Sequence, residues 1–286
     1  MSTFYSILCL LVGIFLYQSS WSAPIQIVAA ENFYGSVAEE IGGSYVEVQS
    51  IMNQPDQDPH LFNIGPSTTK RIGKADLIVF NGLGYDPWMQ NLLSANTVPT
   101  RTVICVGQLL NKKEGANPHV WYDPATMPVY AKALLDYLSQ QDPDHQMDYR
   151  RNYQEFLEKY KRLIHLIYRL KPRTEHLKVI ATEPVFSYMA QALGFDMQGI
   201  NFQISMMNGI DPSPRQILAF QNQLQTNHVR IVFYNKQIDS PLVQRLLMIA
   251  KTHAIPVVGV TEMQPAGKTF EVWMMEPLKK VEKILQ

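Results

Sequence analysis

Cysteine, net charge and long apolar stretches are all scarce in this chain of 286 residues. Its two cysteines are Cys9 and Cys105, and Cys9 falls within an apolar N-terminal run, so a disulfide framework within the mature chain is excluded. Lys and Arg total 25 and Asp and Glu total 25, so the basic footprint of a nucleic-acid-binding protein is missing. We therefore expect a globular protein that has no nucleic-acid partner.

The N-terminus has the pattern of a secretory signal. Residues 4–17 form an uncharged apolar run, and small residues follow at positions 20 and 22, which a signal peptidase inspects. No Lys or Arg precedes the run, which departs from the usual signal. A transmembrane anchor is the alternative, but the run falls short of about 20 residues and ends in the polar residues 18–20. We expect cleavage after Ser22 or Ala23. Because Cys9 lies too early and follows the bulky Leu8, we expect a periplasmic protein without a lipid anchor.

From Ile25 onward, short β-like runs alternate with helical patterns. The predicted strands cover residues 25–29, 45–51, 76–80, 102–106, 178–181, 231–234 and 256–260. The predicted shorter helices cover residues 33–41, 70–74 with Ser67 as N-cap, 88–93, 186–193, 215–225, 241–253 and 269–285. This alternation favours an α/β fold in which parallel sheets are covered by helices on both faces.

One segment, from Pro143 to Lys171, has the period of a single long amphipathic helix. Asp142 and Pro143 resemble an N-cap and first helical residue, and Pro172 would end the helix. At 1.5 Å per residue its length is roughly 40 Å, enough to cross two lobes. We therefore divide the chain into a signal peptide (1–22), an N-terminal lobe (23–142), a connecting helix (143–172) and a C-terminal lobe (173–286).

Four residues form a candidate metal site: His60, His119, Glu183 and Glu262. Each follows a predicted strand, two in each half of the chain, and a proline precedes each histidine and restrains the backbone that presents it. In parallel α/β sheets, ligands bind beyond the carboxyl ends of the strands, so two facing lobes would bring the four side chains toward one cleft. Two imidazoles and two carboxylates suit a divalent transition metal.

Simpler interpretations remain open for each of these residues. A histidine in a loop is often a surface or capping residue, and Glu183 before Pro184 could be a first-turn glutamate favoured by the helix dipole. Glu262 could be a solvated loop acid. The other five histidines are interpreted as solvated or capping residues.

Several motifs carry a resemblance to a known family. They are Asp58-Pro59-His60 with Pro66-Ser67, Lys74-Ala75-Asp76-Leu77 leading to Asn81-Gly82-Leu83, Asn117-Pro118-His119-Val120-Trp121 with Asp123-Pro124, and Glu183 to Tyr188 leading to Gly194. These motifs occur in the order typical of one family. From about Ile25 to its C-terminus, the chain resembles the metal-binding cluster of ABC-transporter solute-binding proteins. That cluster includes zinc and manganese receptors and adhesin-like lipoproteins.

The resemblance implies two α/β lobes joined by one long rigid helix, with one metal ion held between them by His60, His119, Glu183 and Glu262. It also implies a cognate ABC permease and ATPase as partners, and we expect a monomer. Glu183 stands where zinc-type members usually carry histidine and manganese-type members carry glutamate, and Glu262 stands where most carry aspartate. The histidine-rich loop of many zinc receptors is absent.

Donor chemistry leaves the metal open between Mn²⁺ and Zn²⁺. Replacing an imidazole by a carboxylate favours the harder manganese ion, whereas affinity by itself follows the Irving–Williams order and favours zinc. The sequence therefore predicts a manganese or zinc receptor, with a tilt toward manganese.

Two other functions compete with metal import. A metal-dependent hydrolase would need an open metal position and a nearby general base, but the chain has neither a His-Glu-x-x-His helix nor a nucleophile-elbow motif, so we expect no enzyme. A surface adhesin with a structural metal would carry no signature in this sequence, and a neighbouring permease gene would argue against it.

Overall fold

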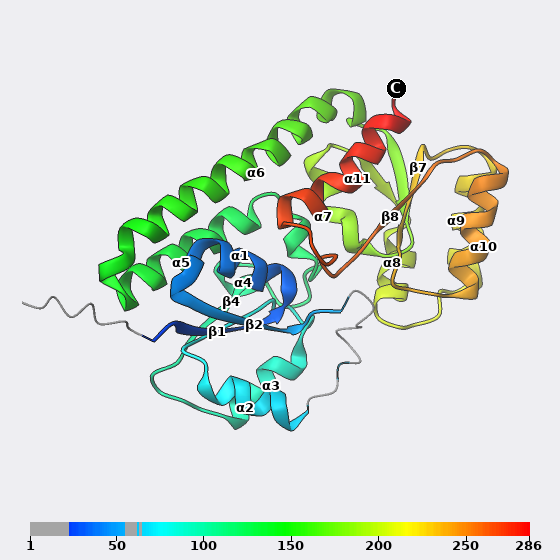
Figure 1. Ribbon diagram of the computed structural model, residues 1–286. Coiled ribbons are helices and arrows are strands. Elements are labelled where there is room, and N and C mark those ends of the chain that lie inside the picture. The colour runs from blue at the N-terminus through cyan, green and yellow to red at the C-terminus, as the bar shows by residue number, and fades with distance from the viewer. Residues whose placement is uncertain (1–22, 55–61, 63–64) are drawn as a thin grey trace, which may run out of the picture.

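The computed structural model describes residues 23–54, 62 and 65–286 (Figure 1). The predicted signal peptide over residues 1–22 and the predicted ligand His60 therefore lie outside the described residues. None of the helices in the described ranges is both long enough and apolar enough to cross a membrane.

The N-terminal lobe is built on a four-stranded parallel sheet with the strand order β2-β1-β3-β4. Its strands are β1 (Ile25–Glu31), β2 (Val46–Met52), β3 (Leu77–Phe80) and β4 (Thr102–Cys105). The helices of this lobe are α1 (Asn32–Gly42), α2 (Pro66–Lys74), α3 (Pro87–Ala95), α4 (Val106–Leu109) and α5 (Thr126–Gln141). Figure 1 shows α1 and α5 on one side of the sheet and α2 and α3 on the other.

The C-terminal lobe repeats this topology in a second parallel sheet of order β6-β5-β7-β8. Its strands are β5 (Lys178–Ala181), β6 (Asp196–Gln198), β7 (Ile231–Asn235) and β8 (Val257–Val260). Its helices are α7 (Ser187–Ala192), α8 (Ile200–Met207), α9 (Pro214–Gln225), α10 (Pro241–Thr252) and α11 (Phe270–Ile284). In both sheets the third strand in chain order lies between the first and the fourth, so β7 separates β5 from β8.

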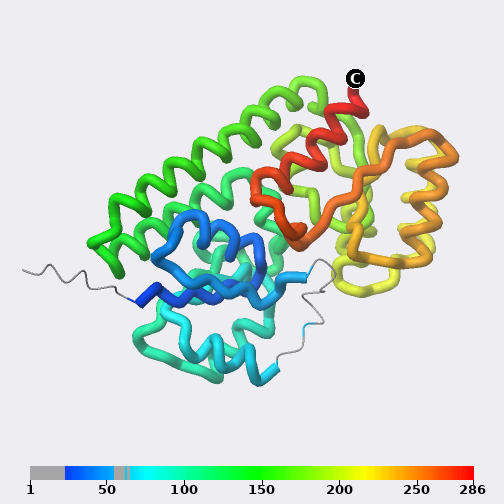
Figure 2. Tube along the Cα trace, viewed as in Figure 1, coloured from blue at the N-terminus to red at the C-terminus, as the bar shows by residue number. Residues whose placement is uncertain are grey.

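A single long helix, α6 (Gln146–Thr174), spans the two lobes (Figures 1 and 2). Its 29 residues make it about 44 Å long. The buried face packs against α1 and α5 of the first lobe and α11 of the second. This face carries the apolar residues that the 3.6-residue period selected, among them Phe156, Tyr160, Leu163, Ile167 and Leu170. The predicted α/β fold with two lobes and a long helix between them is confirmed.

The structure corrects several helix boundaries. The helix of residues 66–74 begins at Pro66 with Gly65 as its cap, so Ser67 is not the N-cap. Pro172 does not end α6, because it lies in the last turn, where the missing N–H costs one hydrogen bond. The end of α6 is held instead by the buried Thr174 hydroxyl, which donates to the Leu193 carbonyl at 2.6 Å.

Candidate metal centre

His119 lies between the two lobes, and an asparagine fixes the orientation of its ring. The Oδ1 atom of Asn117 accepts hydrogen bonds from the backbone N–H of His119 at 3.1 Å and from its ring Nδ1 at 2.6 Å. The Asn117 amide is itself oriented, because its Nδ2 donates to the carbonyl of Pro184 at 2.8 Å. Since Asn117 offers Nδ1 an acceptor, Nδ1 carries the proton and the lone pair of His119 is on Nε2, as in many metal-bound histidines.

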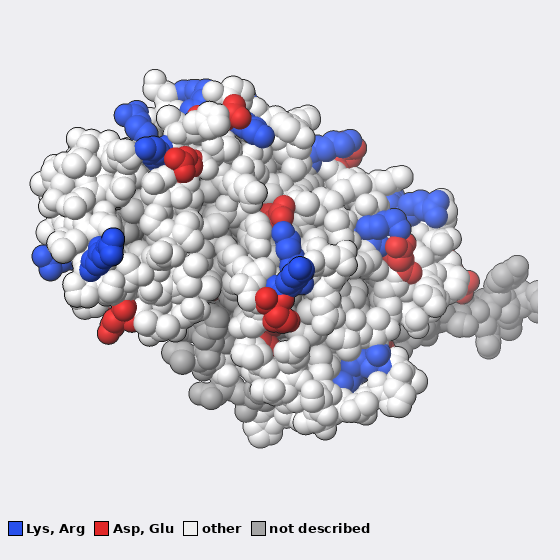
Figure 3. Space-filling view, turned by 180° about the vertical axis from the view of Figure 1, so that it is seen from behind, with Lys and Arg blue, Asp and Glu red and all other residues white. Residues whose placement is uncertain are grey.

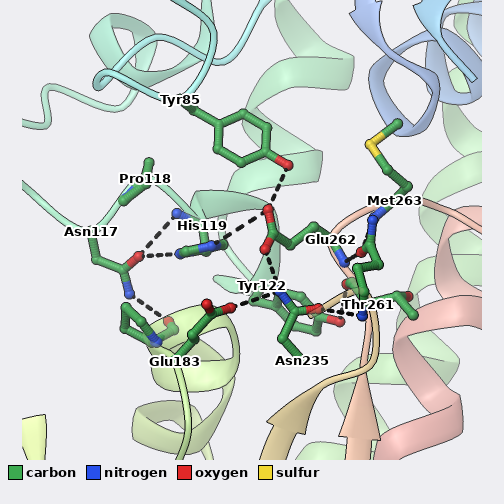
Figure 4. Close-up of polar contacts among 12 residues, drawn as sticks. Tyr85, Asn117, Pro118, His119, Tyr122, Glu183, Asn235, Thr261, Glu262 and Met263 are labelled. Atoms are coloured by element: carbon green, nitrogen blue, oxygen red, sulfur yellow. Dashed lines mark hydrogen bonds and ion pairs between the residues drawn. The ribbon is translucent and has the colours of Figure 1, made fainter. Parts of the chain in front are cut away.

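Glu183 and Glu262 extend from the same edge of the second sheet, after two strands that β7 separates. Glu183 lies two residues after β5 and Glu262 two residues after β8, so the carboxyl ends of these strands place both side chains at one edge. Both residues are buried, with exposed fractions of 7% and 8%. His119 is 2% exposed, and its Nε2 lies 3.9 Å from Oε2 of Glu262. The structure thus brings together three of the four predicted ligands across the lobe interface (Figure 4).

Asn235 joins the two carboxylates. It is the last residue of β7, the strand between β5 and β8, and its Nδ2 lies 2.7 Å from Oε2 of Glu183 and 2.6 Å from Oε1 of Glu262. The sequence prediction missed this residue, because it ended the strand at Tyr234 and considered only charged or imidazole side chains. The rule that selected Glu183 and Glu262, a polar residue at the carboxyl end of a strand, applies to Asn235 as well.

The first lobe contributes Tyr85, whose hydroxyl donates to Oε2 of Glu262 at 3.0 Å. Burial, and then the nearby Glu262 carboxylate, raise the pKa of Tyr85 well above its ordinary value, so the hydroxyl stays protonated and acts as a donor. Tyr85 follows a tight turn that Asp86 closes. The two carboxylate oxygens of Asp86 accept from the backbone N–H groups of Asn81 at 2.6 Å and Gly82 at 2.8 Å.

A second buried carboxyl lies beneath this turn. Glu31, at the end of β1, is fully buried, and its burial and the nearby Asp86 raise its pKa well above the ordinary value. Burial raises the pKa of Asp86 to about 6. The turn that carries Tyr85 therefore packs on the carboxyl groups of Glu31 and Asp86, and simultaneous ionisation of the two is disfavoured because their negative charges would repel each other.

Aromatic side chains and a cleft surround the polar centre. Trp121 lies 5.2 Å from the His119 ring and 4.8 Å from the Tyr85 ring, measured between centroids. Beside the centre is a cleft of about 580 Å³ between the lobes, lined by Asn117 and Pro118 from the first and by Pro184 from the second. The cleft therefore adjoins residues that are sequence neighbours of His119 and Glu183.

Among the residues that the structure describes, no group of three or more His, Cys, Asp or Glu side chains already has the geometry of a metal site. His119 and Glu262 nevertheless face each other, and Asn235 spans the two glutamates. The sequence prediction of a four-residue ligand set remains a prediction.

Two parallel α/β sheets joined by a long helix, with a buried polar centre between them, define a two-lobed solute-binding protein. Residues 27–284 match the family described as zinc-uptake complex component A, periplasmic. The chain belongs to this family. The predicted resemblance to metal-binding ABC-transporter solute-binding proteins is thereby confirmed.

Curated relatives match over most of their length. The metal ABC transporter substrate-binding lipoprotein SloC of Streptococcus mutans is 25% identical over 300 residues, covering 96% of this chain and 95% of that protein. The iron-binding protein YfeA of Yersinia pestis is 28% identical over 238 residues, covering 79% and 74%. The manganese-binding lipoprotein MntA of Halalkalibacterium halodurans is 27% identical, covering 86% and 79%.

Solved structures share the fold. The solute-binding protein FpvC of P. aeruginosa, in complex with Ni²⁺, aligns with a TM-score of 0.76 and 19% identity, covering 92% of this chain and 97% of that one. The periplasmic zinc-binding protein TroA of Treponema pallidum aligns with a TM-score of 0.74 and 19% identity, covering 92% and 98%.

The names of two of these relatives, SloC and MntA, identify them as lipoproteins. The comparisons therefore give no support to the expectation that this chain lacks a lipid anchor. Cys9, on which that expectation depended, lies outside the described residues.

Proposed function

We propose that the chain is the receptor of an ABC importer and captures one divalent transition metal ion, Mn²⁺ or Zn²⁺, between its two lobes. The ligands are His119 from the first lobe, Glu183 and Glu262 from the second, and His60 as the fourth. The ion is the transported substrate, and a membrane permease with its ATPase receives it. The division of the chain into a signal peptide, two lobes and a connecting helix, at the boundaries predicted from sequence, is part of the same proposal.

The observation that carries the proposal is the pair of buried carboxylates next to a buried imidazole with an oriented Nε2. Burying two carboxylates near each other is costly unless a cation compensates their charge. Asn235 donates to both carboxylates, Tyr85 donates to Glu262, and Nε2 of His119 lies 3.9 Å from Oε2 of Glu262. A divalent ion supplies the compensation, and its preferred donors are the groups assembled here.

We expect the receptor to act as a monomer and to bind no nucleic acid. On the face shown in Figure 3, lysine and arginine side chains lie scattered among aspartates and glutamates, without a continuous basic patch. This face therefore has no stripe of basic residues of the kind that binds a phosphate backbone. The family comparison concerns substrate-binding proteins, and we expect no catalytic turnover from this chain.

The test is metal-dependent stabilisation of the purified chain. An ion that binds the folded state alone stabilises it by RT ln(1 + [L]/Kd), about 2.7 kcal/mol at 100 times Kd, so Mn²⁺ or Zn²⁺ should raise the melting temperature. The variant His119→Ala should lose most of this increase, and His165→Ala, which changes an exposed histidine of α6, should keep it. A melting temperature that neither metal moves would refute the proposal.

A further inference from the structure

Glu262 lies on a loop of the second lobe that side chains of the first lobe also hold. This loop, residues 261–269, joins β8 to α11, and Figure 1 shows it beside α1 of the first lobe. Asn32, the first residue of α1, pairs with the backbone of Gln264 in both directions. Its Nδ2 donates to the Gln264 carbonyl at 2.8 Å, and its Oδ1 accepts the Gln264 N–H at 3.2 Å. Two hydrogen bonds from one planar amide fix both the position and the orientation of this stretch of backbone.

Two tyrosines of the first lobe hold the same loop nearer to the metal centre. The Tyr122 hydroxyl donates to the carbonyl of Thr261 at 2.8 Å, and the Tyr85 hydroxyl donates to Oε2 of Glu262 at 3.0 Å (Figure 4). Three positions of the loop, 261, 262 and 264, are therefore each bound by a side chain of the first lobe. Because His119 also belongs to the first lobe, these contacts help to set the distance between its ring and the Glu262 carboxylate.

The second lobe binds a different part of the loop, residues 261–263. Gln237 Oε1 accepts two backbone N–H groups of this part, and Trp273 Nε1 donates to a threonine hydroxyl at 2.8 Å. The backbone of Gln264, in contrast, is bound from the first lobe by Asn32. Without Asn32, the contacts with the second lobe would dominate, and the glutamate of this loop would follow that lobe away from the imidazole of the first.

We propose that Asn32 is a positioning residue for the metal site, which binds the loop of Glu262 to the first lobe and so keeps Glu262 next to His119. This inference rests on the proposed function. The side-chain hydrogen bonds of Asn32 go to the backbone two residues beyond Glu262, not to a ligand. Asn32 therefore acts on the ion through Glu262, and its loss should leave the contribution of Glu183 unchanged.

A double-mutant cycle tests whether Asn32 acts through Glu262. Competition titrations give the Zn²⁺ affinity lost on Asn32→Ala in the wild type, in a Glu262→Ala background and in a Glu183→Ala background. Loss of an outer-shell partner typically lowers metal affinity by about 10- to 100-fold, and Asn32 lies one step further out, so we expect a loss of about tenfold in the wild type. The loss should remain about tenfold in the Glu183→Ala background and fall below about twofold in the Glu262→Ala background.

Asn152→Ala is the matched control. The Asn152 amide also donates to a backbone carbonyl, that of Ile41 at 3.0 Å, but it joins α6 to α1 and not to the loop of the metal site. This variant should keep the wild-type Zn²⁺ affinity. An equal loss on Asn32→Ala in the Glu183→Ala and Glu262→Ala backgrounds would overturn the inference, because that result describes a residue that only stabilises the fold.

Circular dichroism establishes whether each variant is folded. If Asn32→Ala does not fold, Asn32→Asp takes its place in the cycle, since aspartate keeps the acceptor for the Gln264 N–H but sets a second oxygen against the Gln264 carbonyl. If neither folds, hydrogen exchange of the metal-free wild type decides. The Gln264 N–H should be protected as strongly as the N–H groups of α1, and exchange as fast as in an exposed loop contradicts the inference.

The same titrations separate this inference from the proposed function. A wild type that binds neither Zn²⁺ nor Mn²⁺ would refute both together. A wild type that binds Zn²⁺, combined with a folded Asn32→Ala variant of unchanged affinity, would refute the inference alone.

Discussion

The buried carboxyl groups beneath the site predict that Asp86 makes the metal-free protein less stable as the pH rises. Asp86 has an ordinary pKa of 3.8 and a folded-state pKa of about 6, because burial disfavours its charged form. The folded protein therefore holds the Asp86 proton more tightly than the unfolded chain does. The stability from this proton is fully present below pH 3.8 and is lost as the pH rises through about 6.

The size of this loss follows from the two pKa values. A tenfold difference in proton affinity corresponds to about 1.4 kcal/mol, so the total loss is about 3 kcal/mol, of which about 2 kcal/mol falls between pH 4.5 and 7.5. The variant Asp86→Asn cannot ionise, and its altered contacts with the backbone N–H groups change its stability by a similar amount at every pH. The free energy of unfolding of the wild type should therefore fall by about 2 kcal/mol relative to Asp86→Asn across this range.

Urea unfolding in the presence of a chelator, followed by circular dichroism at each pH, measures this difference. Asp136→Asn is the control, because Asp136 is exposed and pairs with Lys132 on the surface of α5. Its difference from the wild type should not follow the same curve. A wild-type stability that stays constant or rises relative to Asp86→Asn over this range would refute the reasoning about the buried pair.

Three further predictions concern the pair and the site. Glu31→Gln should gain stability relative to the wild type as the pH rises above 4.5, because the pKa of Glu31 is raised in the folded state, so its ionisation costs stability, and glutamine cannot ionise. Thermal unfolding at several pH values measures this difference. Melting temperatures of the two proteins that change in parallel with pH would contradict it. Asn117→Ala should lower metal affinity by about 10- to 100-fold in competition titrations, because His119 loses the acceptor that orients its ring, and an unchanged affinity would show that the ring needs no such support. Metal affinity should fall as the solution becomes more acidic, because bound imidazoles must be neutral, and an affinity independent of pH would argue against histidine ligands.

Much of the fold could be predicted because its signals are local. The strand that precedes Glu183 is found over the predicted residues 178–181, since a short apolar run before a helix pattern has few alternatives. The helix α5 was missed although its buried residues Tyr130, Leu134 and Leu138 have helical spacing, because Pro128 near its start resembles a helix breaker. The three-residue strand β6 is too short to give a periodic signal.

The site was predictable to the extent that strand ends reveal it. Glu183 and Glu262 follow β5 and β8, and the same rule applies to Asn235 at the end of β7, but the rule does not reveal that Asn235 bridges the two carboxylates. The contacts of Tyr85 with Glu262 and of Glu31 with Asp86 join segments far apart in the chain. Such pairings depend on tertiary packing, which cannot be predicted from residue types and local spacing.

The central claim is that one ion lies between His119, Glu183 and Glu262. Anomalous diffraction from crystals grown with Zn²⁺, collected on both sides of the zinc absorption edge, tests it most directly. The account predicts one strong peak within about 2.0–2.2 Å of Nε2 of His119 and of one oxygen of each glutamate, with His60 as the fourth ligand. A map with no peak between the lobes, or a peak that contacts neither His119 nor the two glutamates, would contradict it.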